Sequence, residues 1–154
     1  MAKYAAEQLK AKDALLLGRA TYQLLASYWP NAAAYEDNPI LALMLNDIKK
    51  IVFSRTLDRA EWNNSRQIKG NIAEEVVKLK AQPGKDMVIP GSGSIVSALT
   101  RLGLIDEYEF MVIPVVLGRV RSQFEGLDGR VKMKLIKVET LSSGIVILGY
   151  EPVK

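Results

Sequence analysis

The chain contains no cysteine and no histidine among its 154 residues. Without cysteine it can form no disulfide and offers no thiolate nucleophile, a composition typical of cytoplasmic proteins, so we expect a cytoplasmic location. Without histidine, a Ser–His or Cys–His catalytic pair is excluded, and so is a histidine-based metal site. We therefore expect no metal, and any proton transfer must use a carboxylate, a tyrosine, a lysine or water.

Long apolar runs and blocks of charge are also missing. No stretch reaches the ~18 consecutive apolar residues that a membrane span needs, and the first 13 residues, MAKYAAEQLKAKD, lack the apolar centre of a signal peptide. The net charge is +4, but lysine and arginine are scattered along the chain. This charge favours an anionic ligand, and we expect neither a membrane nor a nucleic acid as partner.

One stretch, residues 86–104, has the pattern of a strand, a glycine turn and a helix. The apolar run 87–89 meets Pro90 and the turn Gly91-Ser92-Gly93-Ser94, and apolar residues then recur with helical spacing. Such a turn points backbone N–H groups at an anion, although its serines could equally cap a helix with nothing bound. It is not the Rossmann dinucleotide fingerprint, because Val96 stands where the third glycine should be.

The other segments predict a single α/β domain. Helices are expected at residues 2–12, 20–28, 40–46 and 71–81, and strands at residues 14–17, 50–54, 65–68, 87–89 and 107–117. The first and last of these strands read as buried in the sheet, and residues 31–38 are expected to form a loop. Residues 132–150 alternate apolar and charged positions around a Ser-Gly turn, which predicts an antiparallel hairpin attached to an otherwise parallel sheet.

Polar junctions follow three of the predicted strands, at Gly18–Tyr22, Ser54–Thr56 and Gly91–Ser94. Open α/β sheets bind ligands at the C-terminal ends of their strands. Two of the junctions carry an arginine, the side chain best shaped to hold a phosphate through two hydrogen bonds. Together they predict an extended ligand with several phosphates, such as a dinucleotide with a 2′-phosphate. The alternative is that Arg19 and Arg55 are solvated surface residues.

These motifs, in this order, resemble one family. They are Gly18-Arg-x-Thr-Tyr22, Val52-Phe-Ser-Arg-Thr-Leu57, Gly91-Ser-Gly-Ser94, Leu104-Ile-Asp-Glu-Tyr108 with Ile113-Pro-Val-Val-Leu-Gly118, and Leu148-Gly-Tyr-Glu-Pro152. They are similar to the dihydrofolate-reductase-like fold, in the branch related to the C-terminal reductase domain of the riboflavin-pathway deaminase–reductase. The resemblance implies a three-layer α/β sandwich over residues 1–154, with a mostly parallel central sheet and a C-terminal antiparallel hairpin.

The resemblance also implies NADPH as cofactor. It assigns Gly18, Arg19 and Thr21 to the pyrophosphate and adenosine side, Ser54 and Arg55 to the 2′-phosphate, and Gly91, Ser92, Gly93, Ser94 and Ile95 to the pyrophosphate and nicotinamide side. It further implies a cis or otherwise unusual peptide at Gly91-Ser92, and a homodimer is compatible with it. Tyr22, Tyr28 and Trp29 are candidates for the substrate side, against the alternative that they pack in the core.

The start of the sequence departs from the family pattern. Members usually open with a strand in the middle of the sheet, whereas this sequence begins within the helix that follows. We therefore expect the domain to lack its first strand, and the chain to be a fragment rather than one whose sheet closes or whose strand comes from another chain. The register of dihydrofolate reductase puts the catalytic acid near Ala2, so no catalytic residue is assigned.

The function that we favour is an NADPH-dependent reductase of a small heterocyclic substrate, pyrimidine- or pteridine-like. It would be similar to the 5-amino-6-(5-phosphoribosylamino)uracil reductase of riboflavin biosynthesis or to dihydrofolate reductase. The alternative is a module that binds NADPH or another nucleotide without turnover. A nucleic-acid-binding role rests only on the basic net charge.

Overall fold

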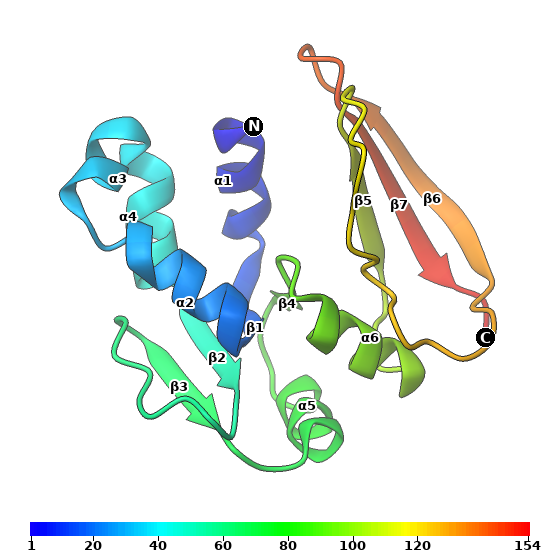
Figure 1. The fold of residues 1–154 in the computed structure, drawn as a ribbon, viewed down its shortest axis with the longest axis horizontal. Helices are drawn as coiled ribbons and strands as arrows, with labels where there is room; N and C mark the ends of the chain where they lie inside the picture. The colour runs from blue at the N-terminus through cyan, green and yellow to red at the C-terminus, as the bar shows by residue number, and fades with distance from the viewer.

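Two β-sheets organise the chain, and the computed structural model describes all residues 1–154 (Figure 1). The helices are α1 (Ala2–Lys10), α2 (Arg19–Tyr28), α3 (Ala32–Asp37), α4 (Pro39–Asp47), α5 (Ile72–Lys80) and α6 (Gly93–Arg101). The strands are β1 (Lys12–Gly18), β2 (Lys49–Phe53), β3 (Ser65–Ile68), β4 (Asp86–Val88), β5 (Tyr108–Val112), β6 (Met133–Thr140) and β7 (Val146–Pro152). None of the helices is long and apolar enough to cross a membrane.

The first sheet is parallel, with strand order β3-β2-β1-β4. Its strand β1 is buried on both faces. Leu15 and Leu17 pack against α1, α2 and α4 on one side, while Ala14 and Leu16 pack against α5 and α6 on the other. Because successive side chains of a strand point to opposite faces, the continuous apolar run serves both layers. This confirms the predicted buried strand and the three-layer α/β/α sandwich of the dihydrofolate-reductase-like fold.

The second sheet is antiparallel, with order β5-β7-β6, and contains the predicted hairpin as β6 and β7. The prediction that this hairpin is attached to the parallel sheet is wrong, because β5 pairs only with β7 and β4 pairs only with β1. The two sheets therefore remain separate, and β4 and β5 each keep one edge without a neighbouring strand. The sheet does not close over that gap.

Two further expectations fail for local reasons. The strand expected over residues 107–117 ends at Val112, since Pro114 has no N–H to donate to a ladder, and residues 113–120 are exposed rather than buried. The segment expected as a loop contains helix α3, because three consecutive alanines with strong helix propensity follow Asn31.

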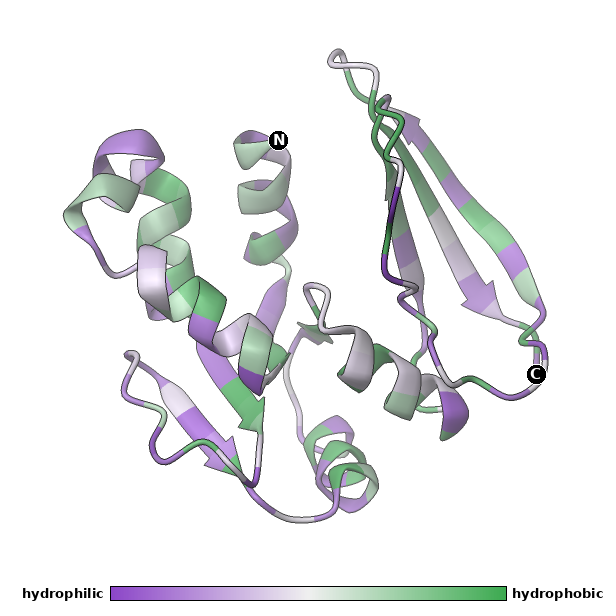
Figure 2. Cartoon of the chain, in the orientation of Figure 1, coloured by the Kyte–Doolittle hydropathy of each residue, from purple (hydrophilic) through white to green (hydrophobic).

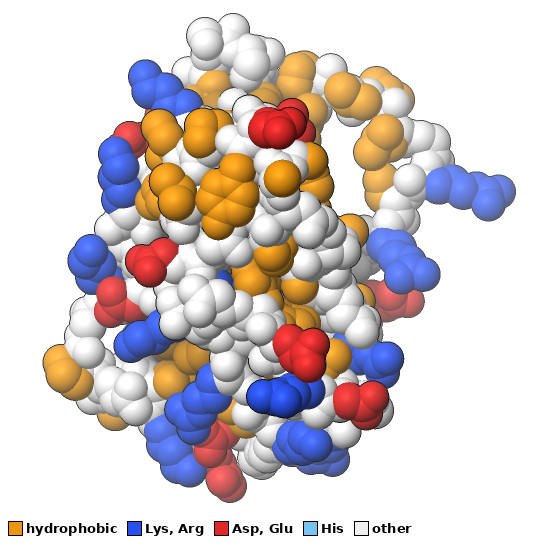
Figure 3. Space-filling model, turned by 90° about the vertical axis from the view of Figure 1, so that its left-hand side faces the viewer, with side chains coloured by type: hydrophobic (Ala, Val, Ile, Leu, Met, Phe, Trp, Pro, Cys, Tyr) orange, Lys and Arg blue, Asp and Glu red, His pale blue; other side chains and the backbone are white.

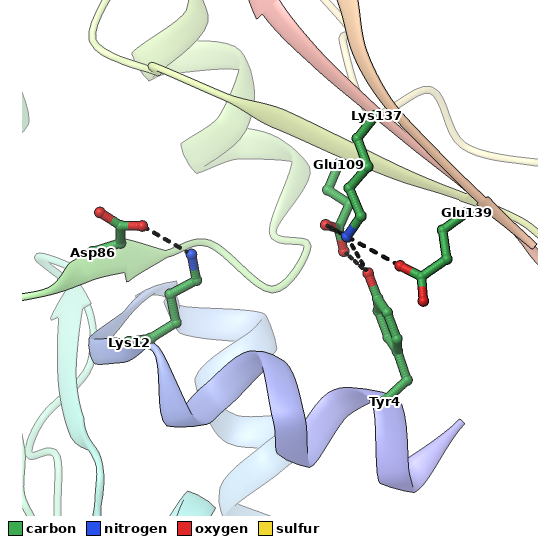
Figure 4. Close-up of polar contacts among 6 residues, drawn as sticks. All are labelled: Tyr4, Lys12, Asp86, Glu109, Lys137 and Glu139. Atoms are coloured by element: carbon green, nitrogen blue, oxygen red, sulfur yellow. Dashed lines mark hydrogen bonds and ion pairs between the residues drawn. The ribbon is translucent and has the colours of Figure 1, made fainter. Parts of the chain in front are cut away.

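Polar contacts connect α1 to the second sheet across the gap (Figure 4). The Tyr4 hydroxyl donates to Glu109 Oε1 at 2.8 Å, and Lys137 Nζ donates to the same hydroxyl at 3.3 Å. Lys137 also lies 3.5 Å from Glu109 and 3.3 Å from Glu139. Burial opposes the charge of Lys137, but its contacts with Tyr4, Glu139 and Glu109 outweigh burial and raise its pKa to about 12. Hydrogen bonds of the Tyr4 hydroxyl, rather than apolar packing, join α1 to the antiparallel sheet at this point.

Candidate functional site

The candidate site lies where β1, β2 and β4 end, at one edge of the parallel sheet. From β1 the chain passes into α2 on one face of the sheet, and from β4 it passes into α6 on the opposite face. β1 and β4 are neighbours in the sheet, so the loops that follow them diverge. Such a topological switch point is where open α/β sheets bind ligands.

The loops after β1 and β4 contact each other through Gly18 and Ser92. The Gly18 N–H donates to Ser92 Oγ at 3.2 Å. A Cβ at Gly18 would lie 2.5 Å from that oxygen and 3.3 Å from Ile95 Cγ1, so any other residue there would force both side chains to move. The Ser92 hydroxyl accepts from Gly18 and no side chain caps α6, so the alternative in which the serines of this turn serve as a helix cap does not hold.

The backbone of the glycine turn is unusual, although not through a cis bond. All peptide bonds of the chain are trans, so the expected cis form at Gly91-Ser92 is wrong. However, Gly91 has φ 89° and Ser92 has φ 59°, and a serine in the left-handed region is uncommon. The sequence analysis expected either a cis bond or another unusual backbone conformation at Gly91-Ser92, and the second of these is what the turn has. Helix α6 begins at Gly93 with no side chain on its first N–H groups.

The loop after β2 joins the same edge through Arg19. Arg19 Nη1 donates to Thr56 Oγ1 at 2.9 Å. The Ser54 hydroxyl accepts from the N–H groups of Thr56 at 3.3 Å and Leu57 at 3.0 Å, which holds this loop in shape. Thr21 lies in the first turn of α2, directly after Arg19 and Ala20. The structure thus brings the three predicted junctions together, while their role in binding stays a prediction.

Beside Arg55 an open pocket of about 380 Å³ lies between the ends of β2 and β3 and the start of α5. Its lining residues are Phe53, Ser54, Arg55, Ile68, Lys69, Gly70, Asn71 and Ile72. Arg55 Nε donates to the Lys69 carbonyl at 3.3 Å. The sequence analysis missed Lys69; the parallel neighbourhood of β2 and β3 is the signal that could have found it.

The cations at this edge are free of carboxylate partners. Arg19, Arg55 and Lys69 take part in none of the ion pairs of the structure. Their positive charge is therefore available to an anion, with a fixed backbone turn beside it. No group of three or more His, Cys, Asp or Glu side chains gathers as metal ligands would.

The aromatic candidates of α2 lie elsewhere. Tyr22 is buried in the core, where its hydroxyl accepts from the backbone N–H of Trp62 at 2.9 Å and its ring lies beside the Trp62 ring. The core-packing alternative therefore holds for Tyr22. Tyr28 donates to Asp37 Oδ2 at 2.6 Å and packs edge-on against Trp29. Tyr28 and Trp29 are at the opposite end of α2 from Gly18, and a substrate contact by either stays a prediction.

Comparisons with known proteins agree with this architecture. The family described as the RibD C-terminal domain matches residues 1–147. The uncharacterized protein YyaP of Bacillus subtilis (strain 168) is 36% identical over 138 residues, which are 90% of this chain and 73% of YyaP.

Two solved structures have a similar fold. A candidate riboflavin biosynthesis protein of Shewanella sp. PV-4 has a TM-score of 0.73 at 20% identity, covering 95% of this chain and 77% of its own. A diaminohydroxyphosphoribosylaminopyrimidine deaminase/5-amino-6-(5-phosphoribosylamino)uracil reductase of Thermotoga maritima has a TM-score of 0.64 at 15% identity. It covers 98% of this chain, which spans 48% of the Thermotoga protein.

Proposed function

The chain belongs to the RibD C-terminal domain family, and on this premise we propose that it is an NADPH-dependent reductase of a small pyrimidine- or pteridine-like substrate. The observation that carries the proposal is the meeting of the three strand-end loops, through the Gly18–Ser92 and Arg19–Thr56 hydrogen bonds. Among substrates we favour a pyrimidine, since the Thermotoga protein of similar fold is named as a uracil reductase.

The residues at this edge of the sheet suit the anionic parts of NADPH. The pyrophosphate would lie between the first turns of α2 and α6, held by backbone N–H groups and Arg19. The 2′-phosphate would bind Arg55 and Lys69, and the apolar walls of the pocket at Phe53 and Ile72 would receive the adenine. NADPH itself supplies the hydride, and these side chains bind and orient it.

Cofactor choice provides the direct test. We expect NADPH to bind more tightly than NADH in a fluorescence titration, because only NADPH has the 2′-phosphate that Arg55 would contact. Arg55→Ala should weaken NADPH binding by about 1.5–3 kcal/mol, as for other hydrogen bonds to charged groups, and leave NADH binding unchanged. Arg66→Ala is the matched control, because Arg66 is an exposed arginine on β3 outside the pocket lining.

Equal affinity of the wild type for NADPH and NADH would contradict the assignment of Ser54 and Arg55. A loss of affinity for both cofactors in Arg55→Ala would also count against it, since the arginine would then act on a shared part of the ligand.

A nucleotide-binding module without turnover is the second candidate function. The first turn of α1, where dihydrofolate reductase places its acid, contains no acidic residue. An assay of NADPH oxidation in the presence of a pyrimidine or pteridine separates the two candidates. The oxidation is monitored as the loss of absorbance of the reduced nicotinamide. Tight NADPH binding with no oxidation across a substrate panel would favour the module.

A further inference from the structure

The turn that follows β2, Ser54–Leu57, is held by a side chain from the neighbouring strand β3. Gln67 Nε2 donates to the Ser54 carbonyl at 3.1 Å and to the Leu57 carbonyl at 2.6 Å. Because both partners are acceptors, the amide nitrogen must face them, and both of its N–H groups are used. A single side-chain amide thus spans the two central residues of the turn, one of which is Arg55.

The ends of the turn are fixed to the rest of the sheet as well. The Ser54 N–H donates to the Ile68 carbonyl at 3.1 Å, and Leu57 is buried in a core cluster. Between these two ends Arg55 is exposed, with Nε donating to the Lys69 carbonyl at 3.3 Å. Arg55 is therefore an exposed side chain on a turn whose backbone is attached to β3 and to the core.

Gln67 occupies a core-facing position of β3. It is paired with Val52 of β2, and residues paired across neighbouring strands share a face. Val52 and Leu57 belong to the core cluster on the side of α2 and α4, so the partly buried Gln67 side chain is directed to that side. Figure 2 shows β3 coloured mostly hydrophilic beside the hydrophobic second half of β2. A partly buried amide needs hydrogen-bond partners, and the carbonyls of the turn supply them.

Positive charge alone does not distinguish NADPH from NADH at this end of the molecule. Lys and Arg side chains are frequent at the lower end of Figure 3, the end at which β2 and β3 finish in Figure 1. Such charge attracts any anion, including the pyrophosphate that both cofactors contain. A guanidinium selects a phosphate when it is held in the orientation that aligns two hydrogen bonds. Selectivity for the 2′-phosphate therefore depends on the geometry of the turn as well as on the charge of Arg55.

We propose that Gln67 is a positioning residue that sets the preference for NADPH over NADH, an inference that rests on the proposed function. It holds the Ser54–Leu57 turn so that Arg55 meets the 2′-phosphate. Gln67 does not line the pocket beside Arg55, and it has no N–H group left for a cofactor. Its effect on binding is therefore exerted through Arg55, and is confined to the phosphate that NADH lacks.

The test is a pair of fluorescence titrations of Gln67→Met, one with NADPH and one with NADH. Methionine has a similar length but no amide, so the two carbonyls lose their donor. We expect the Kd for NADPH to rise about five- to tenfold and the Kd for NADH to change by less than about twofold, since one or two hydrogen bonds are lost. Gln82→Met is the matched control, because Gln82 is an exposed glutamine beyond the opposite end of α5 from the pocket. It should bind both cofactors as the wild type does.

A double-mutant cycle with Arg55→Ala shows whether Gln67 acts through Arg55. If it does, Gln67→Met should have little further effect on NADPH binding once the arginine is gone, so that the two substitutions are not additive. A merely structural role of Gln67 predicts equal losses of affinity for NADPH and NADH, and additive effects in the cycle. Either of these results overturns the proposal.

Urea unfolding shows whether the variants fold. If Gln67→Met does not, Gln67→Asn is titrated instead: its amide is one methylene too short to reach both carbonyls, and an unchanged preference for NADPH in that variant overturns the proposal. The outcomes also separate this inference from the function on which it rests. A wild type without preference for NADPH contradicts the assignment of Arg55 itself. A preference that is lost in Arg55→Ala but kept in Gln67→Met leaves that assignment intact and overturns only the role of Gln67.

Discussion

The parallel and antiparallel sheets are stabilised in different ways. Both apolar core clusters consist of residues no later in the chain than Ile105, so β5, β6 and β7 contribute to neither. Helices cover both faces of the parallel sheet, whereas the antiparallel sheet buries Ile145 and Ile147 and leaves much of its opposite face in contact with water. The parallel sheet is therefore packed on both faces, and the antiparallel sheet depends more on polar contacts.

The largest expected effect contrasts one leucine from each sheet. Leu17 has no exposed surface, so Leu17→Ala should lower the free energy of unfolding by about 2–5 kcal/mol. Leu135→Ala should change it by less than about 0.5 kcal/mol at low protein concentration, because half of that side chain is already hydrated. Urea unfolding measures both. Equal costs for the two leucines would remove the contrast.

A second contrast uses two glycines at the candidate site. Gly18→Ala should destabilise the protein by about 1–3 kcal/mol and weaken NADPH binding, because the new Cβ pushes on Ser92. Gly18 has φ −82°, which any residue adopts, so this cost comes from contact alone. Gly70→Ala is the control for stability, since a Cβ there meets no atom within 4 Å. If both substitutions are neutral, the two loops are less tightly packed than the structure indicates.

The sequence predicted the parallel part of the fold better than the antiparallel part. The structures of the Ala14–Leu17 run and of the Gly-Arg and Gly-Ser turns are determined by neighbouring residues in the sequence. Strand, turn and helix can therefore be predicted there from short patterns. The division into two sheets depends on which strands pair with each other, and strand pairing is not encoded in any local pattern. The same holds for the point at which β5 ends. Lys69 joins the site for the same reason, through the pairing of β2 and β3.

Lys50 is another residue whose surroundings the sequence concealed. It has no exposed surface, and Nζ donates to the carbonyls of Leu45 at 2.7 Å and Asn46 at 3.0 Å while lying 4.3 Å from the centre of the Trp62 ring. Burial lowers its pKa to about 8, against a smaller opposing effect of Asp47. Lys137 at the antiparallel sheet shows the opposite pKa shift, because its hydrogen bonds to Tyr4 and Glu139 and the charge of Glu109 outweigh its burial.

The lowered pKa of Lys50 predicts how the free energy of unfolding responds to pH. Between pH 8 and pH 10.5 the unfolded chain keeps a proton on Lys50 that the folded chain has lost, so the free energy of unfolding should rise with pH across this window. The neutral amine still has two N–H groups for its two carbonyls. The control is Lys49→Met, which removes an exposed lysine. Urea unfolding at pH 7 and close to pH 10 should show this rise in that variant. Lys50→Met should have lost it, and a rise of the same size in both variants would contradict the assignment.

The smallest expected effect concerns the contact that links α1 to the antiparallel sheet. Tyr4→Phe removes the hydroxyl between Glu109 and Lys137, and should cost about 0.5–1 kcal/mol because the three side chains remain partly hydrated. Tyr28→Phe is chemically matched: it removes the hydroxyl that donates to Asp37, a contact between neighbouring helices on the side of the parallel sheet. Hydrogen exchange distinguishes the two, since Tyr4→Phe should speed exchange of amides in β5 and β7 and Tyr28→Phe should leave them unchanged. If Tyr4→Phe speeds exchange in β1 and β2 equally, the two sheets unfold as one unit, and the difference between them is one of packing without a difference in local stability.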